Sequence, residues 1–117
     1  MKKILLIDKD EFYLKVFKYK LEKSGDFEVH TFSSGNNAEQ EIAKINPDLV
    51  FMELVLPGID GFEIIKKLKD KFSFVVVSQL QGEKDKELAH KVGAKAFLSK
   101  EGIPTNSIMK TALEFLQ

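Results

Sequence analysis

Short apolar runs alternate along this chain with longer segments whose apolar residues recur at helical spacing. The apolar runs cover residues 3–7, 27–32, 48–54, 74–78 and 94–99. Runs of this length, bounded by turn-forming residues, are typical of strands, and near-continuous apolar runs indicate strands buried on both faces. The pattern therefore predicts five strands.

The segments between these runs carry the helical periodicity and cover residues 10–25, 33–46, 62–72, 82–93 and 105–117. In the first helix the apolar residues at helical spacing fall into two sets, Phe12 with Val16 and Tyr13 with Phe17 and Leu21. The fourth helix is highly charged and has only a thin apolar stripe, Leu88 and Val92. We expect this helix to be loosely anchored.

Capping and turn residues mark several of these boundaries. Asp10 and Asp60 are suited to be N-caps of the first and third helices. Gly25 and Pro47 predict the ends of the first and second helices. The segment "PGIDG", residues 57–61, predicts a turn.

Strict alternation of strands and helices predicts an α/β fold with a parallel sheet and helices on both faces. A length of 117 residues suits one domain, residues 1–117, and 44% hydrophobic residues suffice for a core. Eighteen basic and 18 acidic residues give a net charge of +0, which indicates no nucleic-acid partner. The lack of cysteine excludes disulfides and thiol chemistry.

No apolar stretch approaches the roughly 20 residues that span a bilayer. Asp8 ends the first apolar run too early for a signal peptide. The two histidines, His30 and His90, have no carboxylate or cysteine at ligand spacing, so we expect structural or exposed roles for them. These observations predict a soluble cytoplasmic domain without a membrane partner.

Polar residues follow four of the five predicted strands. They are Asp8, Lys9 and Asp10 after the first strand, Glu53 in the third, Ser78 and Gln79 at the fourth, and Ser99 and Lys100 at the fifth. In open α/β sheets, ligands bind beyond the carboxyl ends of the strands. We therefore expect a polar pocket there, with Asp10 capping a helix in preference to joining it.

The segments "ILLIDKDEFYLKVFKYKLEKSG", "PDLVFMELVLPGIDGFEII", "FVVVS" and "VGAKAFLSK" resemble the CheY-like receiver domains of two-component response regulators. The resemblance spans the whole chain and implies a flavodoxin-like (βα)5 three-layer sandwich with strand order 2-1-3-4-5. It places Asp8 at the first acid of a magnesium-binding pair, and Ser78 and Lys100 at the residues that contact the phosphoryl group. Phe97 matches an aromatic residue that changes rotamer on activation.

The resemblance also exposes departures from the family pattern. Lys9 stands at the second acid, Glu53 at the phosphoacceptor aspartate, Gln79 at a small residue, and Glu101 at a proline. Because Lys9 removes an oxygen ligand and adds a positive charge, we expect magnesium binding to be weak or absent. Either the Lys9 ammonium fills the region of the metal, or Lys9 points into solvent.

Glu53 is one methylene longer than aspartate, which adds a bond of about 1.5 Å. A misplacement near 1 Å costs on the order of a hundredfold in rate, and Gln79 would crowd the entry. Glu53 would instead extend toward Ser78 and Lys100 as a permanent mimic of the phosphorylated state. The alternative is an ion-pair cluster with no set state.

Glu101 also bears on the loop that follows the last strand. A cis bond without proline costs roughly 2.5–4 kcal/mol. We therefore expect a trans peptide before Glu101 and a loop path that is set by Pro104.

These features predict a pseudo-receiver, a non-enzymatic signalling module that acts by protein–protein interaction independently of aspartyl phosphorylation. The resemblance implies a histidine kinase, an output domain or another signalling protein as partner. It also implies a homodimer through the last two helices and the fifth strand. Two alternatives stay open: a genuine receiver phosphorylated at Glu53 or Asp8, and a pseudo-receiver that senses a small ligand.

Overall fold

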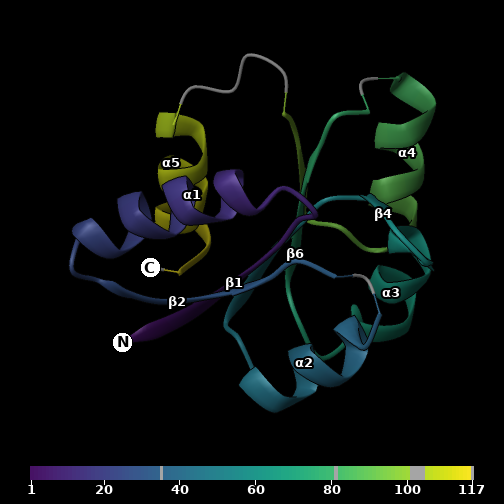
Figure 1. Ribbon diagram of the computed structural model, residues 1–117. Coiled ribbons are helices and arrows are strands. Elements are labelled where there is room, and N and C mark those ends of the chain that lie inside the picture. The colour runs from purple at the N-terminus through teal and green to yellow at the C-terminus, as the bar shows by residue number, and fades with distance from the viewer. Residues whose placement is uncertain (35, 81, 101–104, 117) are drawn as a thin grey trace.

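The computed structural model describes residues 1–34, 36–80, 82–100 and 105–116 (Figure 1). At its centre is a five-stranded parallel sheet in the order β2-β1-β3-β6-β7. The strands are β1 (Lys2–Ile7), β2 (Phe27–Phe32), β3 (Leu49–Met52), β6 (Phe74–Ser78) and β7 (Ala96–Ser99). Counted among these five strands alone, the order is the predicted 2-1-3-4-5, which confirms the flavodoxin-like topology.

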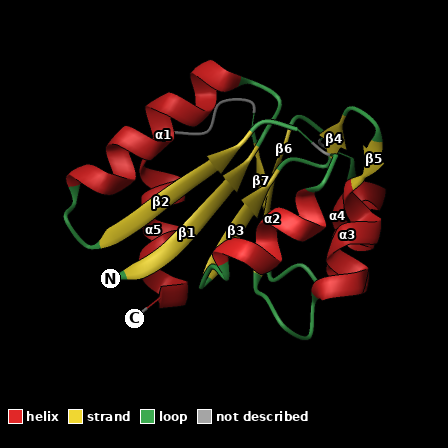
Figure 2. Ribbon diagram, turned by 60° about the horizontal axis from the view of Figure 1, so that its bottom comes forward, coloured by secondary structure: helices red, strands yellow, loops and turns green. Residues whose placement is uncertain are grey.

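Five helices cover the two faces of this sheet (Figure 2). They are α1 (Glu11–Lys23), α2 (Ala38–Ile45), α3 (Gly61–Leu68), α4 (Glu83–Val92) and α5 (Thr105–Leu116). Side chains alternate between the faces of a strand, so Leu5 and Ile7 pack with α2, α3 and α4, whereas Ile4 and Leu6 pack with α1 and α5. The result is the predicted three-layer sandwich.

Helix α1 begins where the sequence predicts. The Asp10 carboxylate accepts hydrogen bonds from the backbone N–H groups of Phe12 and Tyr13, at 3.0 and 3.1 Å. Gly25, with φ of 81°, follows the helix end. The buried stripe differs from the predicted one, because Leu14 packs inward with Phe17 and Leu21 while Phe12 is 77% exposed.

A short hairpin follows β3 that the sequence pattern did not predict. Its strands are β4 (Val55–Leu56) and β5 (Ile59–Asp60), which pair antiparallel around the Pro57–Gly58 turn. Gly58 has φ of 77°, a conformation that glycine adopts without strain. Asp60 then caps α3 as predicted, accepting from the N–H of Phe62 at 2.9 Å.

Helix α4 is attached to the core by a narrow contact. Ala89 is its one fully buried residue, whereas the predicted stripe residues are 42% exposed at Leu88 and half-buried at Val92. The expectation of a thinly anchored helix therefore holds, although the anchor is a different residue. The predictions for Glu101 and Pro104 lie outside the described residues.

None of the helices within the described ranges combines the length and the apolar character that crossing a bilayer requires.

Candidate functional site

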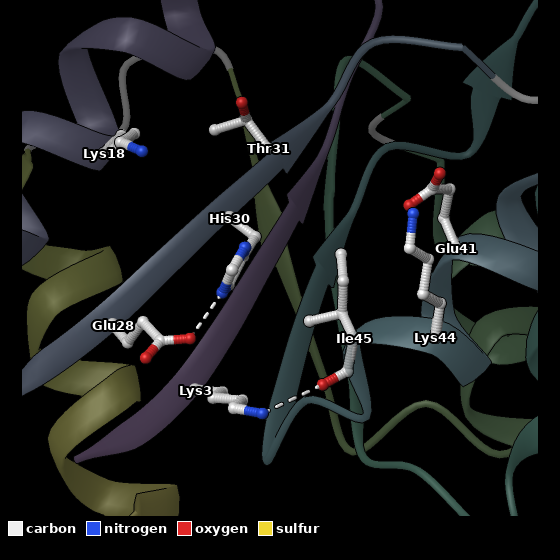
Figure 3. A pocket seen from close by; sticks show the side chains of 8 residues that line it. All are labelled: Lys3, Lys18, Glu28, His30, Thr31, Glu41, Lys44 and Ile45. Carbon is white, nitrogen blue, oxygen red and sulfur yellow. Dashed lines mark hydrogen bonds and ion pairs between the residues drawn. The ribbon is translucent and has the colours of Figure 1, made fainter.

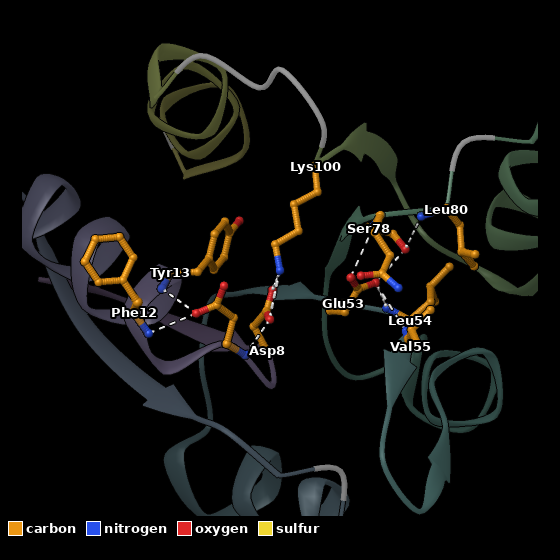
Figure 4. A network of polar contacts seen from close by, with 11 residues as sticks. Asp8, Phe12, Tyr13, Glu53, Leu54, Val55, Ser78, Leu80 and Lys100 are labelled. Atoms are coloured by element: carbon orange, nitrogen blue, oxygen red, sulfur yellow. Dashed lines mark hydrogen bonds and ion pairs between the residues drawn. The ribbon is translucent and has the colours of Figure 1, made fainter.

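The ends of four strands bring polar side chains to one edge of the sheet (Figure 4). Asp8 follows β1, Glu53 follows β3, Ser78 ends β6 and Lys100 follows β7. Backbone hydrogen bonds continue the sheet register into these positions. The N–H of Glu53 donates to the carbonyl oxygen of Ile7 at 3.0 Å, and the N–H of Lys100 donates to the carbonyl oxygen of Ser78 at 2.6 Å.

One half of the site is an ion pair between Asp8 and Lys100. The Lys100 ammonium lies 2.8 Å from one carboxylate oxygen of Asp8 and 3.0 Å from the other. The N–H of Asp10 also donates to Asp8, at 2.9 Å. Burial raises the pKa of Asp8 from its ordinary value, while these bonds and the Lys100 charge oppose the rise.

Tyr13 of α1 covers the Lys100 side of this pair. The Lys100 nitrogen lies 4.4 Å from the centre of the Tyr13 ring, within the range of a cation–π contact. Burial, followed by the negative charges of Asp8, Glu53 and Asp10, raises the pKa of Tyr13, so its hydroxyl stays protonated. In the sequence, only the helical stripe marked this residue.

The other half of the site is the Glu53 carboxylate, which is 1% exposed. One oxygen accepts from the N–H of Leu54 at 2.7 Å, the N–H of Val55 at 3.2 Å and the hydroxyl of Ser78 at 2.5 Å. The second oxygen accepts from the N–H of Gln79 at 3.2 Å. Four neutral donors therefore satisfy this buried charge.

Ser78 is oriented by a bond of its own. Its oxygen accepts from the N–H of Leu80 at 3.1 Å, and its single hydroxyl proton is donated to Glu53. Gln79 is exposed and contributes its backbone N–H to the site. The predicted contact between Glu53 and Ser78 is therefore present. The predicted approach of Glu53 to Lys100 is wrong, because the Lys100 ammonium is hydrogen-bonded to Asp8.

Lys9 does not fill the space beside the carboxylates. It is exposed, and no ion pair of its ammonium occurs among the described residues. The ammonium beside Asp8 belongs to Lys100, so the structure agrees with the solvent-facing alternative for Lys9.

Phe97 of β7 is half-buried and packs against the α2–α4 core. Its role as a switch residue stays a prediction.

The part of the chain that the structure describes contains no group of three or more His, Cys, Asp or Glu side chains that could hold a metal ion.

A second cavity, of about 540 Å³, lies beside the edge strand β2 (Figure 3). It is lined by Lys3, Lys18, Glu28, His30, Thr31, Glu41, Lys44 and Ile45. His30 lies 2.6 Å from the carboxylate of Glu28 and both side chains are partly exposed, in agreement with the structural or exposed role expected for this histidine. Lys3 and Lys18 donate to backbone carbonyls. Internal partners thus take up Lys3, Lys18, Glu28 and His30.

The fold and this site together define a flavodoxin-like α/β protein with its polar centre at the carboxyl edge of a parallel sheet. Residues 4–112 match the family model of the response regulator receiver domain. The chain therefore belongs to the receiver-domain family of two-component signal transduction.

Individual relatives agree with this assignment. The chain is 33% identical, over 106 residues, to the alkaline phosphatase synthesis transcriptional regulatory protein PhoP of Bacillus subtilis (strain 168). The match covers 88% of this chain but 44% of that protein, so the chain spans less than half of this curated relative.

Solved structures share the fold. The BeF3-activated N-terminal receiver domain of Klebsiella pneumoniae RstA superimposes with a TM-score of 0.87 at 26% identity, covering 99% of this chain and 100% of that one. A two-component response regulator from Clostridium difficile gives 0.91 at 22% identity, covering 99% and 96% of the two chains.

Proposed function

We propose that this chain is a pseudo-receiver that signals through protein–protein contacts independently of aspartyl phosphorylation, with the Glu53 carboxylate in the place of a phosphoryl group. The observation that carries this proposal is the set of four donors on Glu53, which includes the hydroxyl of Ser78. In the receiver pattern that this chain resembles, the residue at the position of Ser78 contacts the phosphoryl group.

The surroundings of Glu53 argue against its use as a phosphoacceptor. A carboxylate oxygen that attacks phosphorus needs a free lone pair and an open approach. Glu53 is 1% exposed, and one of its oxygens already accepts three hydrogen bonds. Phosphoryl transfer depends on positioning and on neutralising charge, and the donors here hold the carboxylate turned inward.

The mimicry extends over one side of the pocket. The longer glutamate side chain reaches Ser78 directly, while Lys100 stays paired with Asp8. A carboxylate also carries less charge and fewer acceptor oxygens than a phosphate. We therefore propose that the domain is held in one signalling state. The contact between Glu53 and Ser78 would determine the surface that partners recognise in this state.

Magnesium does not fit the residues present. The ion requires hard oxygen ligands in near-ideal octahedral geometry. Both Asp8 oxygens accept from the Lys100 ammonium, and both Glu53 oxygens accept N–H or O–H donors. Lys9 stands where the receiver pattern has its second acid, so no step of the proposed function uses a metal.

The partners that we propose are other signalling proteins, such as a histidine kinase or an output domain. A homodimer through α4, β7 and α5 belongs to the same proposal, as does the lack of catalytic turnover. A net charge of +0 gives this domain no electrostatic attraction to nucleic acid.

The test is incubation with acetyl phosphate and magnesium, followed by intact-mass spectrometry. We expect the wild-type chain to gain no phosphoryl group. The matched control is the double variant Glu53→Asp with Lys9→Asp, which restores two acids of the receiver pattern. We expect this variant to gain one phosphoryl group. Stable incorporation into the wild type would overturn the proposal in favour of a genuine phosphoacceptor.

A further inference from the structure

We propose that the groove between α3 and α4 binds an acidic, amphipathic helical segment of a partner protein. The groove has a volume of about 340 Å³ and is lined by Lys66, Lys69, Leu88, Lys91 and Val92. Its residues come from α3, the α3 C-cap Lys69 and α4, so this site shares no residue with the Glu53 pocket.

The two helices approach each other closely at their C-terminal ends. Lys69 is the C-cap of α3, and Gly93, with φ of 121°, is the C-cap of α4. A Cβ atom placed on Gly93 would lie 2.7 Å from the Cβ of Lys69, closer than two such atoms pack. Glycine at this position therefore allows the two helix ends to meet, and their contact closes one end of the groove. The rest of the groove between the helices is open.

The floor of the groove is apolar and partly exposed. Leu88 and Val92 lie one helical turn apart on α4, and Leu88 is 42% exposed. Ala89 makes the fully buried contact of α4 with the core, and the half-buried Val92 packs against the same core, so Leu88 is the exposed part of the floor. A partner that covered this floor would remove the exposed part of Leu88 from water, which favours association.

The rim of the groove is basic. Lys66, Lys69 and Lys91 surround the floor. Of these three lysines, only Lys69 forms an ion pair within the described residues, with Asp70 at 3.7 Å. The Asp70 side chain is 91% exposed, so water screens that pair. The rim thus carries three lysines even though the chain as a whole has a net charge of +0.

Charge and shape together select the occupant. A trough between two helices accepts the apolar stripe of a third helix, whose anchors recur at i and i+4. The three lysines select carboxylates on the flanks of that stripe and speed its association. The lining contains no aromatic residue on which a nucleobase would stack.

The direct test uses a short synthetic helix with leucines at i and i+4 and glutamates on its flanks, titrated into the ¹⁵N-labelled chain. We expect saturable chemical-shift changes confined to the amides of α3 and α4. Binding measured by fluorescence anisotropy should weaken with added salt, because the rim charges are exposed. The same helix with lysine in place of glutamate should bind at least tenfold more weakly, about 1.4 kcal/mol.

Variants locate the site. Lys66→Glu with Lys91→Glu should weaken the acidic helix at least tenfold, and Leu88→Ser should do so without changing the salt dependence. Lys15→Glu with Lys20→Glu, on exposed positions of α1, makes the same charge change outside the groove and should have little effect. Circular dichroism and thermal unfolding would establish that each variant is folded.

Three results would overturn this proposal. The first is binding that the groove variants and the α1 control weaken equally. The second is a concentration-dependent dimer, seen by sedimentation, that both Lys66→Glu on α3 and Leu88→Ser on α4 abolish, because a second copy would then occupy this groove and not the α4, β7 and α5 face. The third is binding to phosphatidylserine vesicles, lost in the groove variants, with none to the acidic helix, because the ligand would then be a lipid surface.

Discussion

The two carboxylates of the site are equally buried but are stabilised in different ways. Asp8 is neutralised by an ammonium group, whereas Glu53 is surrounded by neutral N–H and O–H donors. Lys100 is a long side chain, 92 residues away in sequence, that can take other positions. The donors of Glu53 are largely main-chain groups, which move only if the backbone moves.

The charge of Asp8 is therefore balanced by a side chain that one substitution can remove, whereas the charge of Glu53 is stabilised mainly by backbone donors. The Asp8 half depends on one ion pair, and its strength should follow pH and substitution of Lys100. The Glu53 half depends on the turn from β3 into β4 and on the end of β6. We therefore expect the fixed state of this domain to be set by Glu53 and tuned by Asp8.

Replacing Glu53 by leucine should have the largest effect on stability. The change leaves buried N–H groups and the Ser78 hydroxyl without an acceptor, each at about 1–3 kcal/mol. We expect a loss of roughly 3–5 kcal/mol in the free energy of unfolding, measured by urea denaturation. Glu53→Gln is the matched control and should cost less, because it keeps one acceptor oxygen.

Replacing Lys100 by methionine should have the next largest effect. It leaves the buried Asp8 carboxylate without its counter-charge, which costs about 3–5 kcal/mol for a fully buried pair. Because the Lys100 side chain is 17% exposed, we expect a loss nearer about 2–3 kcal/mol at neutral pH. The amide signals of Leu54 and Val55 should not move.

A double-mutant cycle would separate this pair from the rest of the pocket. Adding Asp8→Asn to Lys100→Met should recover most of the lost stability, because no unpaired charge then remains buried. Simple additivity of the two substitutions would contradict the account of Asp8 as the ion-pair half.

Asp10→Ala should cost about 1 kcal/mol, the usual penalty for losing a side-chain N-cap. The Asp10 N–H, which donates to Asp8, stays in place, so the Asp8–Lys100 pair should survive. Asp10→Asn keeps a capping oxygen and should be nearly neutral. Chemical denaturation measures both changes, and a large loss in the asparagine variant would place Asp10 within the charged site.

The smallest effect concerns the pH dependence of Asp8. Its pKa is raised in the folded chain, chiefly by burial, so folding favours the protonated form. The stability of the wild type relative to Asp8→Asn should therefore fall as pH rises from the ordinary pKa, 3.8, through the raised folded value. Because the Glu53 charge contributes to that rise, Glu53→Gln should lower the pKa of Asp8 in an NMR titration.

The sequence predicted the fold well because its signals are local or periodic. Five apolar runs became the five strands of the main sheet, and Asp10 and Asp60 became caps at the expected helix starts. Strand order then placed Asp8, Glu53 and Ser78 at one edge. Parallel strands share their carboxyl edge, so this convergence follows from topology alone.

The sequence did not reveal the hydrogen bonds that backbone groups make in the site. Three of the four donors on Glu53 are backbone N–H groups, and residue types do not show where such groups point. The β4–β5 hairpin, whose first residue Val55 supplies one of these donors, is too short for a periodic signal. The choice of Lys100 over Lys9 as the partner of Asp8 depends on where each side chain can reach, which the pattern of polar positions does not specify.

The most direct test of the central claim is the ¹H–¹⁵N NMR spectrum of the wild type with and without acetyl phosphate and magnesium. If Glu53 already occupies the donors of the pocket, the amide signals of Leu54, Val55 and Gln79 stay where they are. The Glu53→Asp, Lys9→Asp variant should show shifts at the same amides. Shifts of these signals in the wild type would mean that Glu53 gives up its donors, and would contradict the account.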